Sequence, residues 1–151
     1  MTEISNIRSY RLQSIGTSNL ALPAFLAKLK AAQTHLLIDL RSRPQSRWFP
    51  HFNQRSLRSA LESNEISYLW MGDLLGGFQE GFKKFEEYMA ADPQGRFTSG
   101  IAKLLKILKD AAGPVAIMCS ERDVNKCHRK AILEYVLQKT PTAKRIEVTY
   151  L

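Results

Sequence analysis

The sequence predicts an α/β protein in which a sheet of about five mostly parallel strands lies between two layers of helices. Short apolar segments, typical of strands buried on both faces, alternate with longer segments whose apolar residues repeat at helical spacing. This alternation favours right-handed crossovers and a three-layer α/β/α sandwich, Rossmann-like or flavodoxin-like. The length of 151 residues suits one domain, residues 1–151, with a single core.

The chain begins with a predicted strand, a helix and a second strand. Residues 7–15 have β-branched and aromatic side chains near both ends, and residues 16–18 form a turn after them. Pro23 suits the first turn of a helix. Residues 35–40 are a nearly continuous apolar run, which indicates a buried strand. The apolar residues at helical spacing between these strands are Phe25, Leu26, Leu29 and Ala32.

The middle of the chain contains a loop, a helix and the third strand. Residues 41–53 hold two prolines and no helical period, so we expect a loop. Residues 54–63 are helical in pattern, and residues 66–71 form a strand. The glycines within residues 75–77 then break the chain.

The second half contains three predicted helices and two strands. Asp92 is a good N-cap with a proline at the next position, and Gly113 and Pro114 end the same helix. In order, the elements are a helix at 81–91, a helix from Asp92 to Gly113, a strand at 115–118, a helix from Asp123 to about Gln138, and a strand at 145–150.

The composition favours an anionic partner. The chain has 22 Lys and Arg residues against 14 Asp and Glu residues, a formal charge of +8, so nucleic acid is the leading candidate. A basic but inert surface explains the charge equally well. No apolar run approaches the roughly 20 residues of a membrane helix, and residues 1–11 do not resemble a signal peptide. We therefore expect no membrane association, a cytoplasmic location and two reduced cysteines.

Ligands of parallel sheets gather outside the carboxyl ends of the strands. The predicted segments at that edge are residues 16–18, 39–53, 72–77 and 119–123. They are also the most polar and least periodic parts of the chain, so we expect a functional site there.

Residues 119–129, CSERDVNKCHR, concentrate reactive side chains between a buried strand and a helix. A helix N-terminus carries partial positive charge and stabilises a thiolate or a bound anion. One interpretation is that Cys119 is a nucleophile and that Glu121 or His128 moves protons. In this interpretation Arg122 and Arg129 form the anion pocket. The alternative is that Cys119 is a small buried side chain that fills core space.

Cys119 and Cys127 with one further ligand could hold zinc, but the sequence pattern does not favour a metal site. The sequence has no CxxC pair, and the adjacent Cys127 and His128 would point about 100° apart on a helix. Neither the GxGxxG nor the GxxxxGK[ST] pattern occurs, so we expect no metal and no cofactor.

The loop after Asp39 is the second candidate site. It holds five arginines and no acidic residue up to Arg58, namely Arg41, Arg43, Arg47, Arg55 and Arg58. Trp48, Phe49 and Phe52 interleave with them. Arginine binds phosphate and aromatic rings stack on bases, which suits a nucleotide or a single strand. The alternative is that the rings fold inward and the arginines stay solvated. Asp39 can bind an arginine of the loop and fix its shape.

Several segments together resemble the family called Domain of Unknown Function 488 (DUF 488). They are SIGTS, IDLRSRPQS with FN following, LLGG, FEEYM and CSERDVNKCHR, in the family's order over nearly the whole chain. The resemblance implies a small Rossmann-like α/β fold and a site, but no established reaction. Thr17 stands where the family usually has histidine, so a role of that histidine does not transfer. The recurring positions correspond to Gly16, Ser18, Asp39, Arg41, Pro44, Ser46, Asn53, Gly76, Gly77, Cys119, Glu121, Cys127, His128 and Arg129.

Three functions follow as hypotheses. The first is a small cytosolic enzyme acting on a phosphate, nucleotide or nucleic-acid substrate, with Cys119, Glu121 and His128 as catalytic residues. The second is a nucleic-acid-binding module that uses residues 41–58 without catalysis. The third is a thiol redox protein in which Cys119 and Cys127 pair reversibly. The residues expected to hold the anion are Gly16, Thr17, Ser18, Asp39, Arg41, Arg43, Ser46, Asn53, Gly76, Gly77, Arg122 and Arg129.

Overall fold

The structure is a computed structural model that describes residues 9–120, 128–139 and 145–151. In this part of the chain five strands form one parallel sheet in the order β3-β2-β4-β1-β5. The parallel sheet is confirmed, although this order is neither the 3-2-1-4-5-6 of Rossmann folds nor the 2-1-3-4-5 of flavodoxin. The strands are β1 (Tyr10–Gly16), β2 (Leu36–Asp39), β3 (Ser67–Trp70), β4 (Val115–Cys119) and β5 (Ile146–Tyr150).

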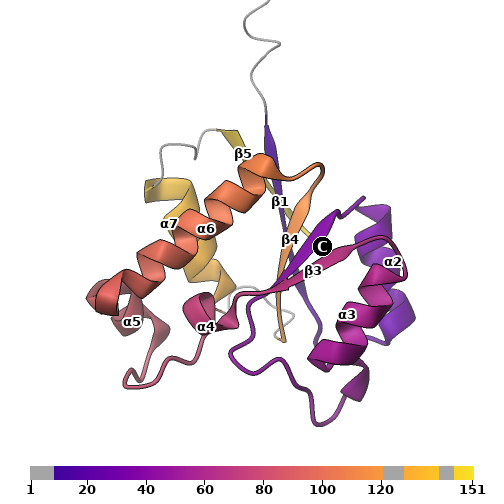
Figure 1. Cartoon of the computed structure of the whole chain (residues 1–151), viewed down its shortest axis with the longest axis horizontal. Coiled ribbons are helices and arrows are strands. Elements are labelled where there is room, and N and C mark those ends of the chain that lie inside the picture. Colours follow the sequence, from indigo (N-terminus) through magenta and orange to yellow (C-terminus); the bar gives the residue numbers. More distant parts are fainter. Residues whose placement is uncertain (1–8, 121–127, 140–144) are drawn as a thin grey trace, which may run out of the picture.

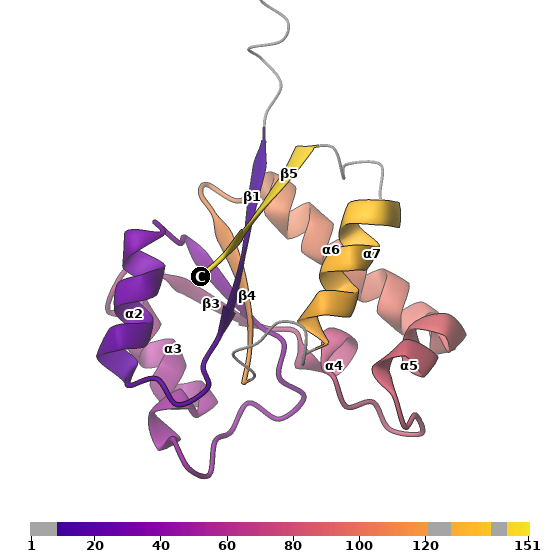
Figure 2. The same ribbon diagram turned by 180° about the vertical axis from the view of Figure 1, so that it is seen from behind.

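Helices cover both faces of the sheet, which confirms the predicted three layers. Helices α2 and α3 lie on one face, and α4 to α7 lie on the other (Figures 1 and 2). The connections from β1 to β2 and from β2 to β3 run in one direction across the sheet, and those from β3 to β4 and from β4 to β5 run in the opposite direction. Because each connection is right-handed, the helices of the first set lie on one face and those of the second set lie on the other. The helices are α2 (Leu22–Ala31), α3 (Gln54–Glu62), α4 (Gly72–Leu75), α5 (Phe85–Ala91), α6 (Arg96–Asp110) and α7 (Arg129–Lys139), with 3-10 turns η1 (Pro50–Phe52) and η2 (Pro93–Gly95).

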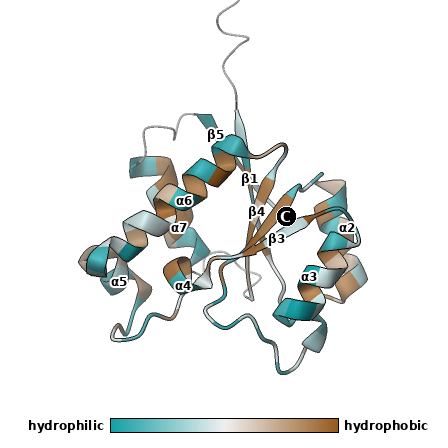
Figure 3. Ribbon diagram, viewed as in Figure 1, coloured by the Kyte–Doolittle hydropathy of each residue, from teal (hydrophilic) through white to brown (hydrophobic). Residues whose placement is uncertain are grey.

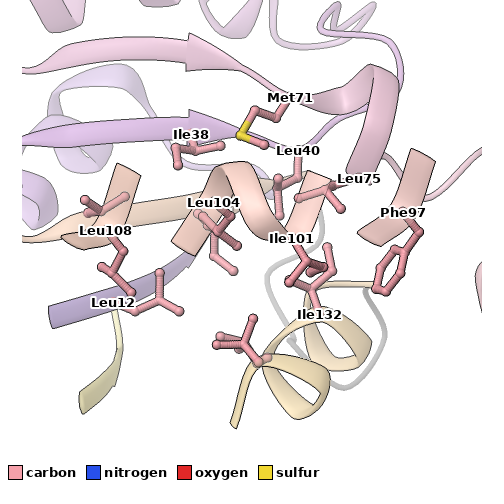
Figure 4. Packing of buried hydrophobic residues seen from close by; sticks show 14 of the residues in the cluster. Leu12, Ile38, Leu40, Met71, Leu75, Phe97, Ile101, Leu104, Leu108 and Ile132 are labelled. Atoms are coloured by element: carbon pink, nitrogen blue, oxygen red, sulfur yellow. The ribbon is translucent and has the colours of Figure 1, made fainter. Parts of the chain in front are cut away.

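Each face of the sheet has its own apolar core, because successive strand residues point to opposite faces. Leu12 and Ile117 join the cluster under α6 and α7, whose packing Figure 4 shows. Ile15 and Met118 join the cluster under α2 and α3. The central strands β2 and β4 are therefore mostly apolar, whereas β1 and β5 also carry polar residues and the helices alternate polar and apolar ones (Figure 3).

Two predicted helices begin later in the structure than in the sequence pattern. Helix α5 begins at Phe85 rather than residue 81, because Gly81 has a φ of +87° that no helix accommodates. Helix α6 begins at Arg96, after Asp92 with a φ of 43° and the turn η2. The carboxylate of Asp92 still caps α6, since it accepts hydrogen bonds from the amides of Phe97 at 2.8 Å and Thr98 at 3.0 Å.

Some predictions concern residues that the structure does not describe, among them the start of the first strand and the cap at Asp123. The short helix α4 and the turn η1 lie in segments that the sequence predicted as loops. Every helix in the described ranges is too short or too polar to cross a bilayer.

Candidate functional site

The loops after β2 and β3 lie next to each other at the carboxyl edge of the sheet, because the two strands are hydrogen-bonded neighbours. In Figure 1 the long loop between β2 and α3 crosses the lower edge of the molecule beside α4. This edge carries the arginine-rich segment that the sequence singled out.

A buried ion pair fixes the start of the β2–α3 loop. The Arg41 guanidinium donates from Nε to Asp39 Oδ1 at 2.9 Å and from Nη2 to Oδ2 at 2.7 Å. The Arg41 amide also donates to Oδ1 at 3.1 Å. Asp39 thus binds an arginine of the loop, as the sequence indicated. The Arg41 guanidinium therefore faces a carboxylate rather than solvent, which does not favour it as an anion ligand.

Tyr68 and Trp70 of β3 extend this pair. The Tyr68 hydroxyl donates to Asp39 Oδ2 at 2.6 Å, and Trp70 Nε1 donates to the Arg41 carbonyl at 2.7 Å. Burial of Tyr68, and next the charge of Asp39, raise the pKa of the Tyr68 hydroxyl, so it stays protonated as a donor. The backbone at Arg41 is consequently tied to two strands.

Glycines allow the two loops to interlock. A Cβ at Gly72 would collide with the Arg41 carbonyl, and one at Gly76 would collide with the Gly72 carbonyl and the Ser42 hydroxyl. Ser42 Oγ accepts a hydrogen bond from the Phe78 amide at 2.8 Å and donates to the Phe78 carbonyl at 3.0 Å. The structure therefore gives Gly76 a packing role between the two loops.

The far part of the β2–α3 loop is held by its own polar groups. The Asn53 side-chain oxygen accepts from the Ser46 amide at 2.6 Å, and Ser46 Oγ accepts from the Phe49 amide at 3.1 Å. The Gln54 amide donates to the Pro44 carbonyl at 2.8 Å. Ser46 and Asn53 were predicted anion ligands, and these contacts show that they shape the loop.

The three rings of the loop divide between the core and the surface. Phe52 is buried against Phe25, with ring centroids 5.0 Å apart, and Phe49 is partly buried. His51 bonds to the Leu20 carbonyl at 3.0 Å. Trp48, in contrast, is 78% exposed. The alternative in which rings fold inward therefore describes Phe52 and, in part, Phe49, whereas Trp48 remains at the surface.

Two exposed rings at this edge each have an arginine beside them. The Arg47 guanidinium carbon lies 5.6 Å from the centroid of Trp48, and that of Arg43 lies 5.8 Å from the centroid of Phe78. Phe78 is 63% exposed and directly follows Gly77. Phe78 is not among the predicted site residues, although its place after two glycines and outside any periodic segment indicates a loop.

The turn after β1 continues its pairing with β4. The Thr17 amide donates to the Cys119 carbonyl at 3.0 Å, and the Ser18 amide donates to the Ser120 carbonyl at 2.8 Å. Thr17 and Ser18 were predicted to help hold an anion, but their amides are engaged within the protein.

Cys119 is 4% exposed and is disulfide-bonded, which differs from the reduced thiol expected from the sequence. The one other cysteine of the chain, Cys127, lies outside the described residues, as do Glu121 and Arg122. A sulfur in a disulfide is not a thiolate, so this state of Cys119 does not support it as a nucleophile.

Arg129 lies on the opposite face of the sheet from Arg41. Its Nη1 donates to Ser14 Oγ at 2.8 Å, and Ser14 shares the face of Leu12, under α7. Asp39 shares the other face with Leu37 and Tyr68. The described residues therefore do not bring Arg41 and Arg129 into one anion pocket.

His128 lies just before α7 and packs its ring against Phe85, with centroids 5.3 Å apart. A Cβ at Gly77 would approach His128 Nδ1 to 2.9 Å, so the absence of a side chain at Gly77 leaves room for the imidazole. Burial lowers the pKa of His128 to about 4, although hydrogen bonding to the Leu40 backbone acts to raise this pKa. The imidazole is therefore neutral at pH 7. It lines a groove of about 750 Å³ between α5 and α7.

In the described residues, no three His, Cys, Asp or Glu side chains form a group suited to a metal ion. A family model described as "Domain of unknown function DUF488" matches residues 21–136. No curated protein and no solved structure matches the chain.

Proposed function

Because the chain belongs to the DUF488 family, whose description names no activity, we propose a function from its own side chains: it binds nucleic acid through the β2–α3 loop. The observation that carries the proposal is the pair of exposed arginines, Arg43 and Arg47, each beside an exposed aromatic ring. Arginine binds phosphate through paired donors, and aromatic rings contact bases.

The distribution of charge supports this choice of ligand. Five arginines and no acidic residue lie within residues 40–61, while the excess of positive charge over the whole chain is eight. Arg41 is paired with Asp39, and Arg58 lies 3.8 Å from Glu62. Arg43, Arg47 and Arg55 therefore supply most of the net positive charge that this segment offers to a polyanion.

The loop is also held in one shape before any ligand binds. The Asp39–Arg41 pair fixes its start, and the Ser46–Asn53 hydrogen bond braces its far part. A preorganised loop loses less conformational entropy on binding, so its contacts contribute more to affinity.

Three described residues of the enzyme hypothesis are engaged inside the protein, while Glu121 and Arg122 lie outside the described residues. Cys119 is buried and disulfide-bonded, His128 packs against Phe85, and Arg129 faces Ser14. These groups offer no thiolate beside an exposed cationic pocket.

Binding can be tested by fluorescence anisotropy with labelled DNA and RNA of about 20 nucleotides and the matching duplexes. We expect affinity that falls by at least tenfold between about 50 and 200 mM salt, as phosphate contacts release counterions. Absence of binding at the lower salt concentration, or binding that salt does not weaken, would reject the proposal.

The disulfide of Cys119 favours a second candidate function, reversible thiol–disulfide exchange. Alkylation followed by mass analysis, after equilibration in graded glutathione buffers, measures the redox midpoint. A midpoint within the range of cellular glutathione would support exchange, whereas resistance to reduction would mark a structural disulfide.

A further inference from the structure

We infer, on the basis of the proposed function, that the preferred ligand is a single strand whose unpaired bases stack on Trp48 and Phe78. Among the described residues, four large apolar side chains are exposed: Trp48, Phe78, Leu137 and Tyr150. Trp48 and Phe78 lie on the two loops that Ser42 joins at the carboxyl edge of the sheet.

Neither ring contributes to the apolar cores. Phe49 and Phe52 from the same loop are packed in the cluster with Phe25, whereas Trp48 is 78% exposed. Phe78 has its amide and carbonyl held by Ser42, so its position on the surface is fixed by the backbone. The molecule therefore presents two positioned ring surfaces to solvent.

Each ring has the neighbour that a stacked nucleotide requires. A nucleotide carries a flat base next to a phosphate. A guanidinium lies over one face of each ring here, within 6 Å of its centroid, so a base would stack on the opposite face. A duplex keeps its bases stacked on each other, so its bases are closed to such rings, whereas a single strand offers them.

The spacing of the arginines limits the length of strand that is needed. Arg43 and Arg47 are four residues apart, so their Cα atoms lie at most about 15 Å from each other. A strand on the order of four nucleotides spans this distance, which is within the site sizes of single-strand-binding proteins.

A strand without bases provides the sharpest test. We expect wild-type protein to bind oligothymidylate at least tenfold more tightly than an abasic strand of equal length and charge. The double variant Trp48→Ala with Phe78→Ala should bind both strands with the weak affinity of the abasic one. Its dependence on salt should remain, because Arg43 and Arg47 are unchanged.

Variants of Trp48 that keep an apolar side chain distinguish stacking on the ring from apolar contact alone. Trp48→Phe retains a ring and should keep most of the affinity, while the quenching of Trp48 fluorescence by the strand should disappear. Trp48→Leu is apolar without a ring and should bind as weakly as Trp48→Ala. Tyr150→Ala, which removes an exposed ring from β5, is the matched control and should bind as wild type does.

The outcomes distinguish this inference from the proposed function. Equal affinity for oligothymidylate and the abasic strand, or tighter binding of duplex, would overturn stacking while nucleic-acid binding stands. Displacement of the strand by polyglutamate at equal charge concentration would likewise overturn it, because charge alone would then suffice. Failure to bind any nucleic acid would reject both.

Discussion

The hydroxyl of Ser42 binds both polar backbone groups of Phe78, accepting from its amide at 2.8 Å and donating to its carbonyl at 3.0 Å. This one side chain therefore joins the loop that carries Arg43 and Arg47 to the loop that carries the exposed ring. The proposed binding surface depends on the two loops keeping this arrangement.

Replacing Ser42 by alanine should loosen the Phe78 loop. We predict a loss of about 1 kcal/mol in the free energy of unfolding and a severalfold loss of affinity for oligothymidylate. Urea denaturation and fluorescence anisotropy measure the two effects. Ser56→Ala, at an exposed serine of α3, is the control and should change neither. An unchanged affinity of Ser42→Ala would show that the loops do not act together.

The effects of replacing Asp39 and Arg41 on the free energy of unfolding should depend strongly on each other. Asp39→Asn leaves a buried guanidinium without its carboxylate, which should cost about 3–5 kcal/mol in the free energy of unfolding. Combining Asp39→Asn with Arg41→Met should cost much less than the sum of the two single losses, because neither charge is then left alone. Additive losses in urea denaturation would contradict this role of the pair.

His128 should make the protein less stable in mild acid. Its pKa is lowered to about 4 by burial, from an ordinary value near 6.5, so protonation favours the unfolded state between these values. The stability that neutral His128 provides is complete above pH 6.5 and is lost as the pH falls toward 4. In His128→Gln this part of the pH dependence should be absent from urea denaturation.

The titration of His128 is also directly observable. NMR of the imidazole should give a pKa well below that of an exposed histidine. A titration of His128 near pH 6.5 would contradict the burial that we describe.

Asp92 should stabilise α6 although three residues separate it from the first helical residue. Its carboxylate accepts from two amides and from the Thr98 hydroxyl at 2.8 Å, which lowers the pKa of Asp92. Asp92→Ala should lower the free energy of unfolding by about 1 kcal/mol. Asp92→Asn should recover most of this loss, because asparagine accepts the same bonds and tolerates a positive φ.

The control for Asp92 is Asp110→Ala at the other end of α6, which removes the same charge from an exposed pair with Lys106. Such exposed pairs contribute little to stability, so this variant should remain close to wild type. Equal losses in the two variants would refute the capping role of Asp92.

The order of strands and helices along the chain could be predicted, because apolar runs and helical periods are local patterns. The late start of α5 could not, since it depends on the positive φ of Gly81. In the site, the pairing of Asp39 with an arginine could be predicted because Asp39 directly precedes the arginine-rich loop. Arg41 is that arginine. No local pattern marks Arg129 as buried, because its partner Ser14 is 115 residues away. Phe78 follows two glycines outside any periodic segment, which indicates a loop, but no local pattern says that its ring is exposed.

We propose that Arg43 and Arg47 contact phosphates, and the salt dependence of binding by the variant Arg43→Ala with Arg47→Ala measures these contacts. The slope of log K against log salt should become shallower by about 1.4, because each phosphate that an arginine neutralises on a single strand contributes about 0.7 to the slope. The control variant Lys103→Ala with Lys109→Ala removes two exposed charges from α6 and should retain the wild-type slope. An unchanged slope in the arginine variant, or equal changes in both variants, would show that Arg43 and Arg47 do not contact phosphates.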